Sequence, residues 1–440
     1  DVIARYQRLL GKEVIFNTGT DEHGQKIYQK ALENEQDPQD YVDHWAHKFD
    51  QLKKLLNLSY DHFIRTTDPN HEAAAQEFWR RCDDNGYIYK DQYQTKYCVG
   101  CELEKTDSEL ENGRCPLHPG SKLEVRDEEN YFFKFSAFAD DLLKLYAKNP
   151  GFVKPESKQK EITSFVKQGL KDFSISRLKE KMPWGIPVPG DDKHVMYVWF
   201  DALVNYISTL GWPEDEENFD KFWPVVQLAG KDNLRQQSAM WQAMLMAAEL
   251  PPSEKILING FIGVDGQKMS KSLGNVIAPS ELVERYGQAA SRYLLINLGV
   301  FGQDMDVTWS RLDEAYPADL ANGLGNLCSR VAKMTEDQSY ELPKVEGFAE
   351  AYQDLMKNYD LTSALNWILD QIKATDQYLS NTQPWKKEGA EKTAILKEAV
   401  KKIQTIAFHL QPFMPETAAM ISDNFTGKIK PMKPLFPRLT

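Results

Sequence analysis

The sequence predicts an α/β protein, in which a Rossmann-like, doubly wound parallel sheet carries a zinc-binding insertion and a C-terminal α-helical bundle. Three observations predict this fold class. Short apolar runs alternate with helix-periodic segments over residues 1–90 and again over 188–262, as in doubly wound sheets. Between these parts, residues 91–187 are rich in Cys, Gly, Pro and short aromatic strands. Over residues 312–440 the strand-like runs stop and the apolar residues recur with the helical period.

The composition limits the class of protein. Of the 440 residues, 42% are hydrophobic, so the chain can build about two to four domains with apolar cores and is not disordered. Its formal charge of −12 disfavours a protein that coats nucleic acid through bulk charge, although a local basic surface stays open. We find no run of about 20 apolar residues, which excludes a membrane span. Five cysteines in so long a chain exclude a disulfide scaffold, and we expect a cytoplasmic protein.

Residues 1–90 are predicted as the first half of the sheet domain. A helix that opens at Val2 ends at Gly11, and the β-branched run after it predicts a strand that leads into TDEHG. We expect the next helix to begin at Asp21, with acidic residues in its first turn. Since the chain starts inside a helix without an initiator Met, a first strand is expected upstream of Asp1. Later helices are predicted over Tyr41–Leu58 and His71–Asp84.

Residues 188–262 are predicted as the second half of the sheet domain. Three strand-like runs, HVMYV, VVQLAG and KILIN, lead into a glycine or a helix, and we expect all three in the parallel sheet. A connecting region follows over residues 263–311, and residues 312–440 are predicted as the helical bundle. From Lys386 to Thr440 the bundle carries ten basic and five acidic residues, which suits contact with nucleic acid phosphates.

Two pairs of metal-ligand residues lie in the insertion. Cys98 and Cys101 are separated by two residues, as are Cys115 and His118, and Gly113 marks a turn between the pairs. Three thiolates and one imidazole at this spacing form a tetrahedral zinc site, with bonds of about 2.0–2.3 Å. The set leaves no open coordination position, so we expect a structural Zn²⁺. A chance cluster of buried thiols is the alternative interpretation.

A glycine- and lysine-rich loop follows the strand-like run ILIN. It runs from Gly260 to Ser272 with the sequence GFIGVDGQKMSKS, which holds three glycines, two lysines and two serines. Such a loop can close over a polyphosphate and match its charge with ammonium groups. Composition alone leaves a solvated basic turn as an equal alternative.

Several motifs resemble those of one enzyme family. KMSKS is the signature of the class I aminoacyl-tRNA synthetases, and the chain resembles the methionyl-tRNA synthetases over nearly its whole length. The family's other signature, of the His-Ile-Gly-His type, is absent and would lie just upstream of Asp1. The further matching motifs are FNTGTDEHGQKI (16–27), FSISR (173–177), MPWGIPVP (182–189), YVWFDALVNY (197–206), AGKD (229–232) and LANGLGNLCSR (320–330).

The resemblance implies a methionine site. Asp21 corresponds to the carboxylate that receives the ammonium group of the amino acid. Trp199, Ala202 and Tyr206 correspond to the pocket for its side chain, where aromatic rings suit a thioether. Without the family, aromatics at this spacing are interpreted as core residues. Gln237 stands where the family commonly has a histidine near this pocket, and it can donate and accept hydrogen bonds but cannot take a proton.

The resemblance also implies an ATP site. Gly230 and Asp232 correspond to the positions that meet the ATP ribose. Lys268 and Lys271 correspond to the loop lysines that stabilise the transition state, and with Ser270 they are expected to bind ATP, which carries Mg²⁺. The connecting region then includes the part that contacts the tRNA stem.

An anticodon site is implied in the helical bundle. Asn326 and Arg330 lie one helical turn apart, so both side chains can reach one base edge. With Trp385 they correspond to the family residues that read the CAU anticodon, Trp385 by stacking on a splayed base. A half-buried aromatic at a helix start is the alternative for Trp385.

The resemblance therefore implies a methionine–tRNA ligase that activates L-methionine with ATP and transfers it to tRNA(Met). Expected partners are these three molecules, without a membrane, and a monomer is expected unless a C-terminal dimerisation domain has been lost. Two alternatives stay open. One is a class I synthetase for another apolar amino acid, and the other is a tRNA-binding module without catalysis.

Overall fold

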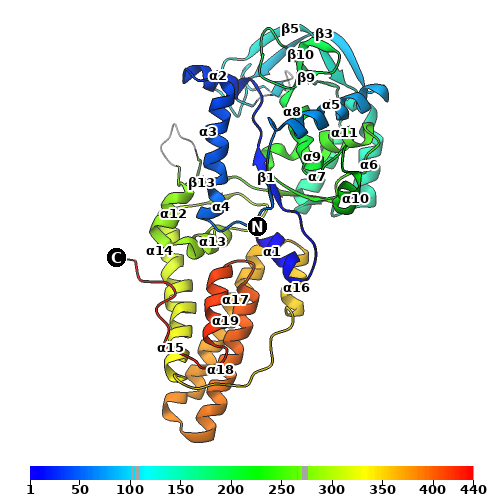
Figure 1. Ribbon diagram of the computed structural model, residues 1–440. Coiled ribbons are helices and arrows are strands. Elements are labelled where there is room, and N and C mark those ends of the chain that lie inside the picture. The colour runs from blue at the N-terminus through cyan, green and yellow to red at the C-terminus, as the bar shows by residue number, and fades with distance from the viewer. Residues whose placement is uncertain (102, 106–109, 265, 270–275, 440) are drawn as a thin grey trace. The chain divides into compact units, whose positions relative to one another are not determined.

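The computed structural model describes residues 1–101, 103–105, 110–264, 266–269 and 276–439 (Figure 1). The chain forms two compact units. The first, here called the sheet unit, comprises residues 17–51 and 60–258. The second, the helical unit, comprises residues 1–16, 52–59 and 259–440. The boundaries mean that the chain passes from one unit to the other four times.

The sheet unit contains parallel strands alternating with helices, as predicted. Strand β1 (Asn17–Thr20) pairs in parallel with β2 (His62–Arg65), and β6 (Val153–Lys154) pairs in parallel with β12 (Lys255–Asn259). Strand β11 (Val226–Gly230) lies on the other side of β12. The α/β fold class is confirmed.

The sheet unit's helices include those predicted near its start, with changed limits. The helix expected from Asp21 begins only at Gln25, because Gly24 has a φ of +105°, which is outside the helical region. The predicted Tyr41–Leu58 helix is divided into two. The helices are α2 (Gln25–Glu33), α3 (Pro38–Asp50), α5 (Pro69–Asp84), α6 (Ala139–Lys148), α7 (Glu156–Lys167), α8 (Val198–Leu203), α9 (Asn205–Ser208), α10 (Glu216–Phe222) and α11 (Trp241–Ala247), with α4 (Leu52–Leu55) in the helical unit.

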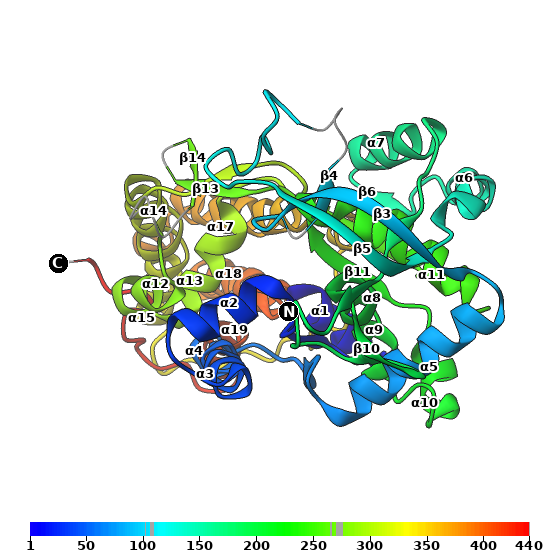
Figure 2. The same cartoon turned by 90° about the horizontal axis from the view of Figure 1, so that it is seen from above.

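Two antiparallel sheets complete the sheet unit. Strands β3 (Ile88–Cys98) and β5 (Glu124–Phe133) form a long ribbon (Figure 2), flanked by β4 (Leu103–Lys105) and β7 (Phe173–Ser174). The run HVMYV was predicted for the parallel sheet, and this was wrong. Its first three residues end β10 (Asp191–Met196), which pairs antiparallel with β8 (Ser176–Leu178) and β9 (Pro187–Val188), and its last residue begins α8. The reason is local, because Gly190, at a φ of +76°, turns β9 directly into β10.

The helical unit has one apolar core, which confirms the predicted bundle. Helix α1 (Val2–Leu9) contributes to this core, since the Tyr6 ring lies 5.0 Å from that of Phe348 and 6.1 Å from that of Tyr352. The other elements are β13 (Ile262–Val264), β14 (Gln267–Lys268), α12 (Pro279–Tyr286), α13 (Gln288–Asn297), β15 (Met305–Asp306), α14 (Trp309–Ala315), α15 (Asn326–Met334), α16 (Glu350–Lys357), α17 (Leu361–Thr382), α18 (Gly389–Leu410) and α19 (Pro415–Asn424). A π-helical stretch, Tyr316–Gly325, joins α14 to α15.

A buried arginine ties three parts of the helical unit together. Arg292 on α13 is 7% exposed, and its guanidinium donates to the Asp1 carboxylate at 2.5 Å. It also donates to four backbone carbonyl groups from two distant segments. These belong to Leu56 (2.9 Å), Asn57 (3.3 Å), Pro412 (3.3 Å) and Phe413 (2.8 Å).

A buried histidine in the same core is held in its neutral form. The Nε2 atom of His409 accepts from the Ala349 backbone N–H at 2.8 Å, and Nδ1 lies 2.8 Å from the Thr405 carbonyl. The ring packs 4.7 Å from Trp367 and 5.0 Å from Tyr352. Burial lowers the pKa of His409, because a proton on Nε2 would remove an acceptor inside an apolar core.

This histidine predicts acid sensitivity. Because its folded pKa lies below its unfolded value of about 6.5, its contribution to stability is fully present above about pH 6.5 and is lost as the pH falls from there through the lowered folded pKa. We expect His409→Gln to be less stable than the wild type at about pH 8, and the difference to shrink at about pH 5.5. Hydrogen exchange of α16 and α18 in both proteins at the two pH values measures this difference in stability. A difference that grows in acid would contradict the prediction.

Candidate functional site

The loop after β1 presents one exposed acid between buried neighbours. In the segment Thr20–Gly24, Asp21 is exposed, while Glu22 is 2% and His23 is 4% exposed. This loop follows the end of a parallel strand, which is where open α/β sheets place their ligands. It therefore holds Asp21 at a ligand-binding edge while its two neighbours fix the backbone.

Glu22 anchors the loop to the end of β2. Its carboxylate accepts two hydrogen bonds from Arg65, at 2.7 and 2.9 Å, and a third from Thr20 at 2.6 Å. Trp184 donates from Nε1 to the Glu22 carbonyl at 2.7 Å. The Glu22 carboxylate is thus held by hydrogen bonds inside the protein, whereas the Asp21 side chain is exposed at the surface of this loop.

His23 anchors the loop to helix α8. Its Nδ1 atom lies 3.2 Å from Oδ2 of Asp201, and the Asp201 side chain is fully buried. Burial by itself lowers the pKa of His23, but the Asp201 carboxylate outweighs burial, so the pKa lies above its ordinary value.

The predicted methionine-pocket residues lie on α8 and α9. Ala202 is buried in a cluster with Tyr197 and Val198, and Trp199 packs against that cluster. Tyr206 accepts a hydrogen bond from Nε2 of Gln237 at 2.9 Å.

Asp21 lies close enough to Tyr206 to act on it electrostatically. Burial raises the pKa of the Tyr206 phenol, and the Asp21 carboxylate raises it further. The structure thereby brings Asp21, Tyr206 and Gln237 into one neighbourhood. Two polar atoms in the same set of predicted residues, Nε1 of Trp199 and Oε1 of Gln237, are buried and lack a hydrogen-bond partner within the described chain.

The predicted ribose-contact residues lie at the end of β11. Gly230 is the last residue of the strand and Asp232 follows in a 3₁₀ turn with its side chain exposed. A Cβ atom on residue 230 would lie 2.8 Å from Oδ1 of Asp232, so glycine leaves room for that carboxylate. Gly230 and the Asp232 carboxylate therefore lie close together at the end of β11.

The predicted phosphate loop belongs to the helical unit and is described only in part. Lys268 ends strand β14, and its backbone pairs with Gly263 of β13. The Gly266 backbone N–H donates to Asp306 at 3.0 Å, which fixes the start of the loop. Ser270 and Lys271 lie outside the described residues, so their predicted roles stay predictions.

The predicted anticodon residues lie at the ends of α15 and α17. Asn326 is exposed at the start of α15, and one turn later the Arg330 guanidinium donates to Asp376 on α17 at 2.5 Å. Trp385 is 50% exposed in a 3₁₀ turn after α17. An exposed indole next to basic residues suits stacking on a nucleic acid base, and a ring that is half exposed also fits the alternative of a half-buried aromatic, so the role of Trp385 stays a prediction.

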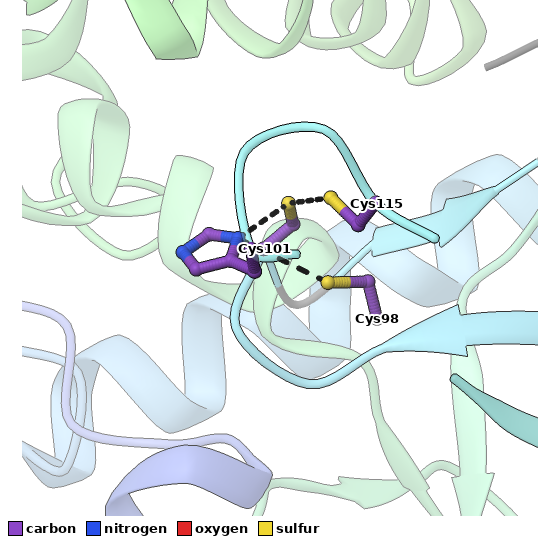
Figure 3. Close-up of side chains that lie close together, drawn as sticks. Cys98, Cys101 and Cys115 are labelled. Atoms are coloured by element: carbon purple, nitrogen blue, oxygen red, sulfur yellow. Dashed lines mark hydrogen bonds between the residues drawn. The ribbon is translucent and has the colours of Figure 1, made fainter. Parts of the chain in front are cut away.

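The predicted metal ligands converge. The ligand atoms of Cys98, Cys101, Cys115 and His118 all lie within 4.8 Å of one another. The Sγ atoms of Cys101 and Cys115 are 3.3 Å apart, and Nδ1 of His118 lies 3.1 Å from Sγ of Cys101 (Figure 3). These distances are too long for a disulfide and near the ligand separations of about 3–4 Å that tetrahedral zinc requires. The group can therefore bind a metal ion.

Two local features favour this arrangement. A Cβ atom on Gly100 would lie 2.6 Å from the His118 ring, so only glycine lets the histidine close over the first ligand pair. Burial raises the pKa of the Cys115 thiol, but hydrogen bonds from Cys101, Cys98 and backbone N–H groups outweigh it and lower the pKa overall. A lowered thiol pKa favours the thiolate that binds metal.

Some side chains that shape the site were not predicted from the sequence. Glu22, His23 and Asp201 lie inside quoted motifs, but only their spatial partners show what they do. His71 and Arg65 lie in no motif. A weak signal was available in TDEHG, where two further ionisable residues directly follow the predicted ligand-binding acid.

In the residues that the structure describes, no helix combines the length and apolar character that crossing a membrane requires.

Comparison with known proteins identifies the family. A family model described as tRNA synthetases class I (M) matches residues 1–118 and 101–332. A methionine–tRNA ligase from Synechocystis is 41% identical over 96% of this chain and 84% of its own, and one from Thermotoga maritima is 40% identical over 98% and 72%. The methionyl-tRNA synthetase of Mycobacterium tuberculosis in complex with methionyl-adenylate superposes with a TM-score of 0.93 at 34% identity, covering 99% of this chain and 94% of that one. With the motifs and the fold in agreement, this chain belongs to the methionyl-tRNA synthetases, within the class I tRNA synthetases.

Proposed function

We propose that this protein joins L-methionine to tRNA(Met) in two steps that pass through methionyl-adenylate. The observation that carries this proposal is the exposed Asp21, whose loop is anchored through Glu22 and His23 and whose carboxylate acts on Tyr206, the hydrogen-bond partner of Gln237. A carboxylate next to aromatic side chains accommodates an ammonium group and an apolar thioether in one ligand. The similarity to a relative in complex with methionyl-adenylate supports the same ligand here.

In the first step, the methionine carboxylate attacks the α-phosphate of ATP and pyrophosphate leaves. Asp21 holds the ammonium group, so the carboxylate of the substrate points away from it toward the nucleotide. Trp199, Ala202 and Tyr206 receive the side chain, and the buried Trp199 Nε1 and Gln237 Oε1 atoms remain available to polar groups of a ligand or water. Holding the reacting groups in this orientation accounts for much of the rate enhancement of such a reaction.

Two groups of predicted residues bind the nucleotide. Gly230 and Asp232 hold the ribose, with the carboxylate accepting hydrogen bonds from its hydroxyl groups. Lys268, Ser270 and Lys271 bind the phosphates and offset the charge of the departing pyrophosphate. Mg²⁺, when bound with ATP, supplies further charge neutralisation. In the second step, the terminal ribose hydroxyl of tRNA attacks the adenylate carbonyl and AMP leaves.

Amino-acid-dependent exchange of labelled pyrophosphate into ATP by the full-length protein tests the first step. We expect exchange with methionine and little with leucine, valine or cysteine. Exchange with one of those amino acids and not with methionine would favour a synthetase for another apolar amino acid. Exchange with no amino acid would favour a tRNA-binding module without catalysis.

The Cys98, Cys101, Cys115 and His118 group is proposed to hold one structural Zn²⁺. Its four protein ligands fill a tetrahedral shell, so the ion stabilises the fold and leaves no position for substrate. The five cysteines carry no disulfide, which fits a reducing compartment such as the cytoplasm.

The metal content of one variant tests this site. The wild type is expected to contain about one zinc per molecule, and Cys98→Ala close to none, because three ligands hold Zn²⁺ far less tightly than four. Mass spectrometry of the purified proteins for metals measures it. Cys82→Ala, which removes a buried thiol outside the ligand group, is the control and should keep its zinc. Equal zinc in Cys98→Ala and the wild type would contradict the site.

The anticodon site is tested by Trp385→Ala. Stacking of a base on an aromatic side chain is worth about 1–3 kcal/mol, so kcat/KM for tRNA is expected to fall about 10- to 100-fold. Pyrophosphate exchange with methionine should stay within about twofold, since it does not involve tRNA. Aminoacylation and exchange measured on one preparation separate the two effects. A parallel loss in both assays would mean that Trp385 acts through the fold.

A further inference from the structure

Buried ionisable side chains link the parts of the proposed methionine site. His23 follows Asp21 by two residues, and its imidazole lies 3.2 Å from the carboxylate of Asp201. Asp201 lies on α8 between Trp199 and Ala202. One ion pair thus joins the loop that carries the proposed ammonium ligand to the helix that carries the proposed side-chain pocket. Its two side chains are 4% and 0% exposed.

A second histidine extends the link to α9. His71, on α5, places Nε2 3.9 Å from Oδ1 of Asp201, and its Nδ1 atom lies 3.0 Å from the hydroxyl oxygen of Ser208. Ser208 ends α9, the short helix that contains Tyr206. Helices α5, α8 and α9 pack against one another (Figure 1), so the contacts of His71 with Asp201 and Ser208 lie within one packed group of helices.

The burial of His23 and Asp201 strongly favours the ion pair between them. Within the described chain the Asp201 oxygens accept no hydrogen bond, and their ion-pair contacts are with these two imidazoles. A buried carboxylate without a counter-charge is strongly unfavourable. Removing the charge of His23 therefore leaves Asp201 to draw in water or to move, and either change displaces the loop or α8.

We propose that His23 and Asp201 are positioning residues for methionine, and that their ion pair sets the distance between Asp21 and the pocket on α8 and α9. His71 supports the pair through Asp201 and Ser208. The inference rests on the proposed function of the site. It assigns no contact with substrate to either residue, since both side chains are buried.

The pair also makes methionine binding depend on pH. Charged or titratable groups face His23 from three elements: Asp201 on α8, Glu72 on α5, and Glu22 in its own loop. His71 faces Asp201 from α5. The three carboxylates favour protonated His23, which therefore keeps its charge past its ordinary titration range. As the pH rises through the raised pKa of His23, the ion pair is lost and KM for methionine should increase.

The test compares His23→Gln, Asp201→Asn and the double variant in methionine-dependent pyrophosphate exchange. Each single variant is expected to raise KM for methionine about tenfold, while KM for ATP stays within about twofold. The double variant should be no worse than the single ones, because both remove one interaction. The rise of KM with pH, measured from about pH 6.5 upward over the range in which the protein stays folded, should be reduced in His23→Gln. Deprotonation of the methionine amine also raises KM as the pH rises, but it does so equally in the wild type and in His23→Gln.

A matched control is available in the same unit. His194 is 3% exposed and its Nδ1 atom lies 3.0 Å from Asp191, but this pair lies in β10, in an antiparallel sheet, and not between the loop and α8. His194→Gln should lower the thermal midpoint and leave KM for methionine and its pH profile unchanged.

The outcomes separate the possible failures. An equal rise in KM for methionine and ATP, additive single effects, or an unchanged pH profile in His23→Gln would overturn the inference. If His23→Gln does not fold, Asp201→Asn and the pH profile of the wild type still decide it. A wild type that shows no methionine-dependent exchange refutes the proposed function itself, whereas an active wild type with unaffected variants refutes only the positioning role.

Discussion

Replacing Asp21 with Ala is expected to lower kcat/KM for methionine activation about a thousandfold. Removing one partner of a charge pair costs about 2–5 kcal/mol, and a thousandfold loss corresponds to about 4 kcal/mol. The loss should be large here because Glu22 cannot replace Asp21. Its carboxylate is already held by Arg65 and Thr20. Pyrophosphate exchange at varied methionine concentration measures the effect, and KM for ATP should change little.

Two further variants make this result specific. Asp21→Asn keeps the size of the side chain and a hydrogen-bond acceptor but loses the charge, so its activity should lie between those of the wild type and Asp21→Ala. Asp40→Ala removes an exposed acid from the first turn of α3 and should leave exchange unchanged. If Asp40→Ala is as impaired as Asp21→Ala, the effect comes from net charge and the assignment of Asp21 fails.

Arg292→Met is expected to lower the free energy of unfolding of the helical unit by about 3–5 kcal/mol. The methionine side chain fills most of the space but removes the donor to the Asp1 carboxylate and to four carbonyl groups. Arg5 still donates to the Asp1 carboxylate and to the Asn57 carbonyl, whereas the Leu56, Pro412 and Phe413 carbonyl groups lose their side-chain donor. Hydrogen exchange of α13 and α19 follows this unit separately from the rest of the chain. Faster exchange in both helices, with β1 and β2 unaffected, is the expected pattern.

Arg285→Met provides the comparison for Arg292→Met. Arg285 lies on α12 and pairs with Asp313 at 2.5 Å, but its side chain is 47% exposed. Exposed pairs contribute little because solvent screens them, so this substitution should have little effect on exchange. Equal destabilisation by the two substitutions would show that the burial of Arg292 does not matter.

The sequence predicted the features that are local in the chain. CxxC and CxxH place their ligands within short loops, so their spacing alone predicts the observed cluster. The helical period identified the bundle for the same reason. The roles of Asp21, Trp199, Tyr206 and Trp385 came from the family resemblance and stay predictions.

Features that depend on distant residues were not predictable in this way. His23 and Asp201 are far apart in sequence, and either alone is interpreted as an ordinary polar residue. The start of α2 was placed too early because acidic residues favour a helix N-terminus, yet Glu22 is drawn into an ion pair with Arg65 and Gly24 breaks the helix. The turn at Gly190 connects β9 to β10 and thereby determines that β10 pairs antiparallel. The apolar content of a run could not distinguish an antiparallel strand from a parallel one.

The division of the helical unit among three stretches of chain affects the order in which the protein can fold during synthesis. Residues 17–258 emerge from the ribosome before most of the helical unit has been translated. Helix α1 emerges earlier still, but the rings that cover Tyr6 belong to Phe348 and Tyr352, which are translated hundreds of residues later. These rings therefore cannot cover the apolar face of α1 until α16 has been translated.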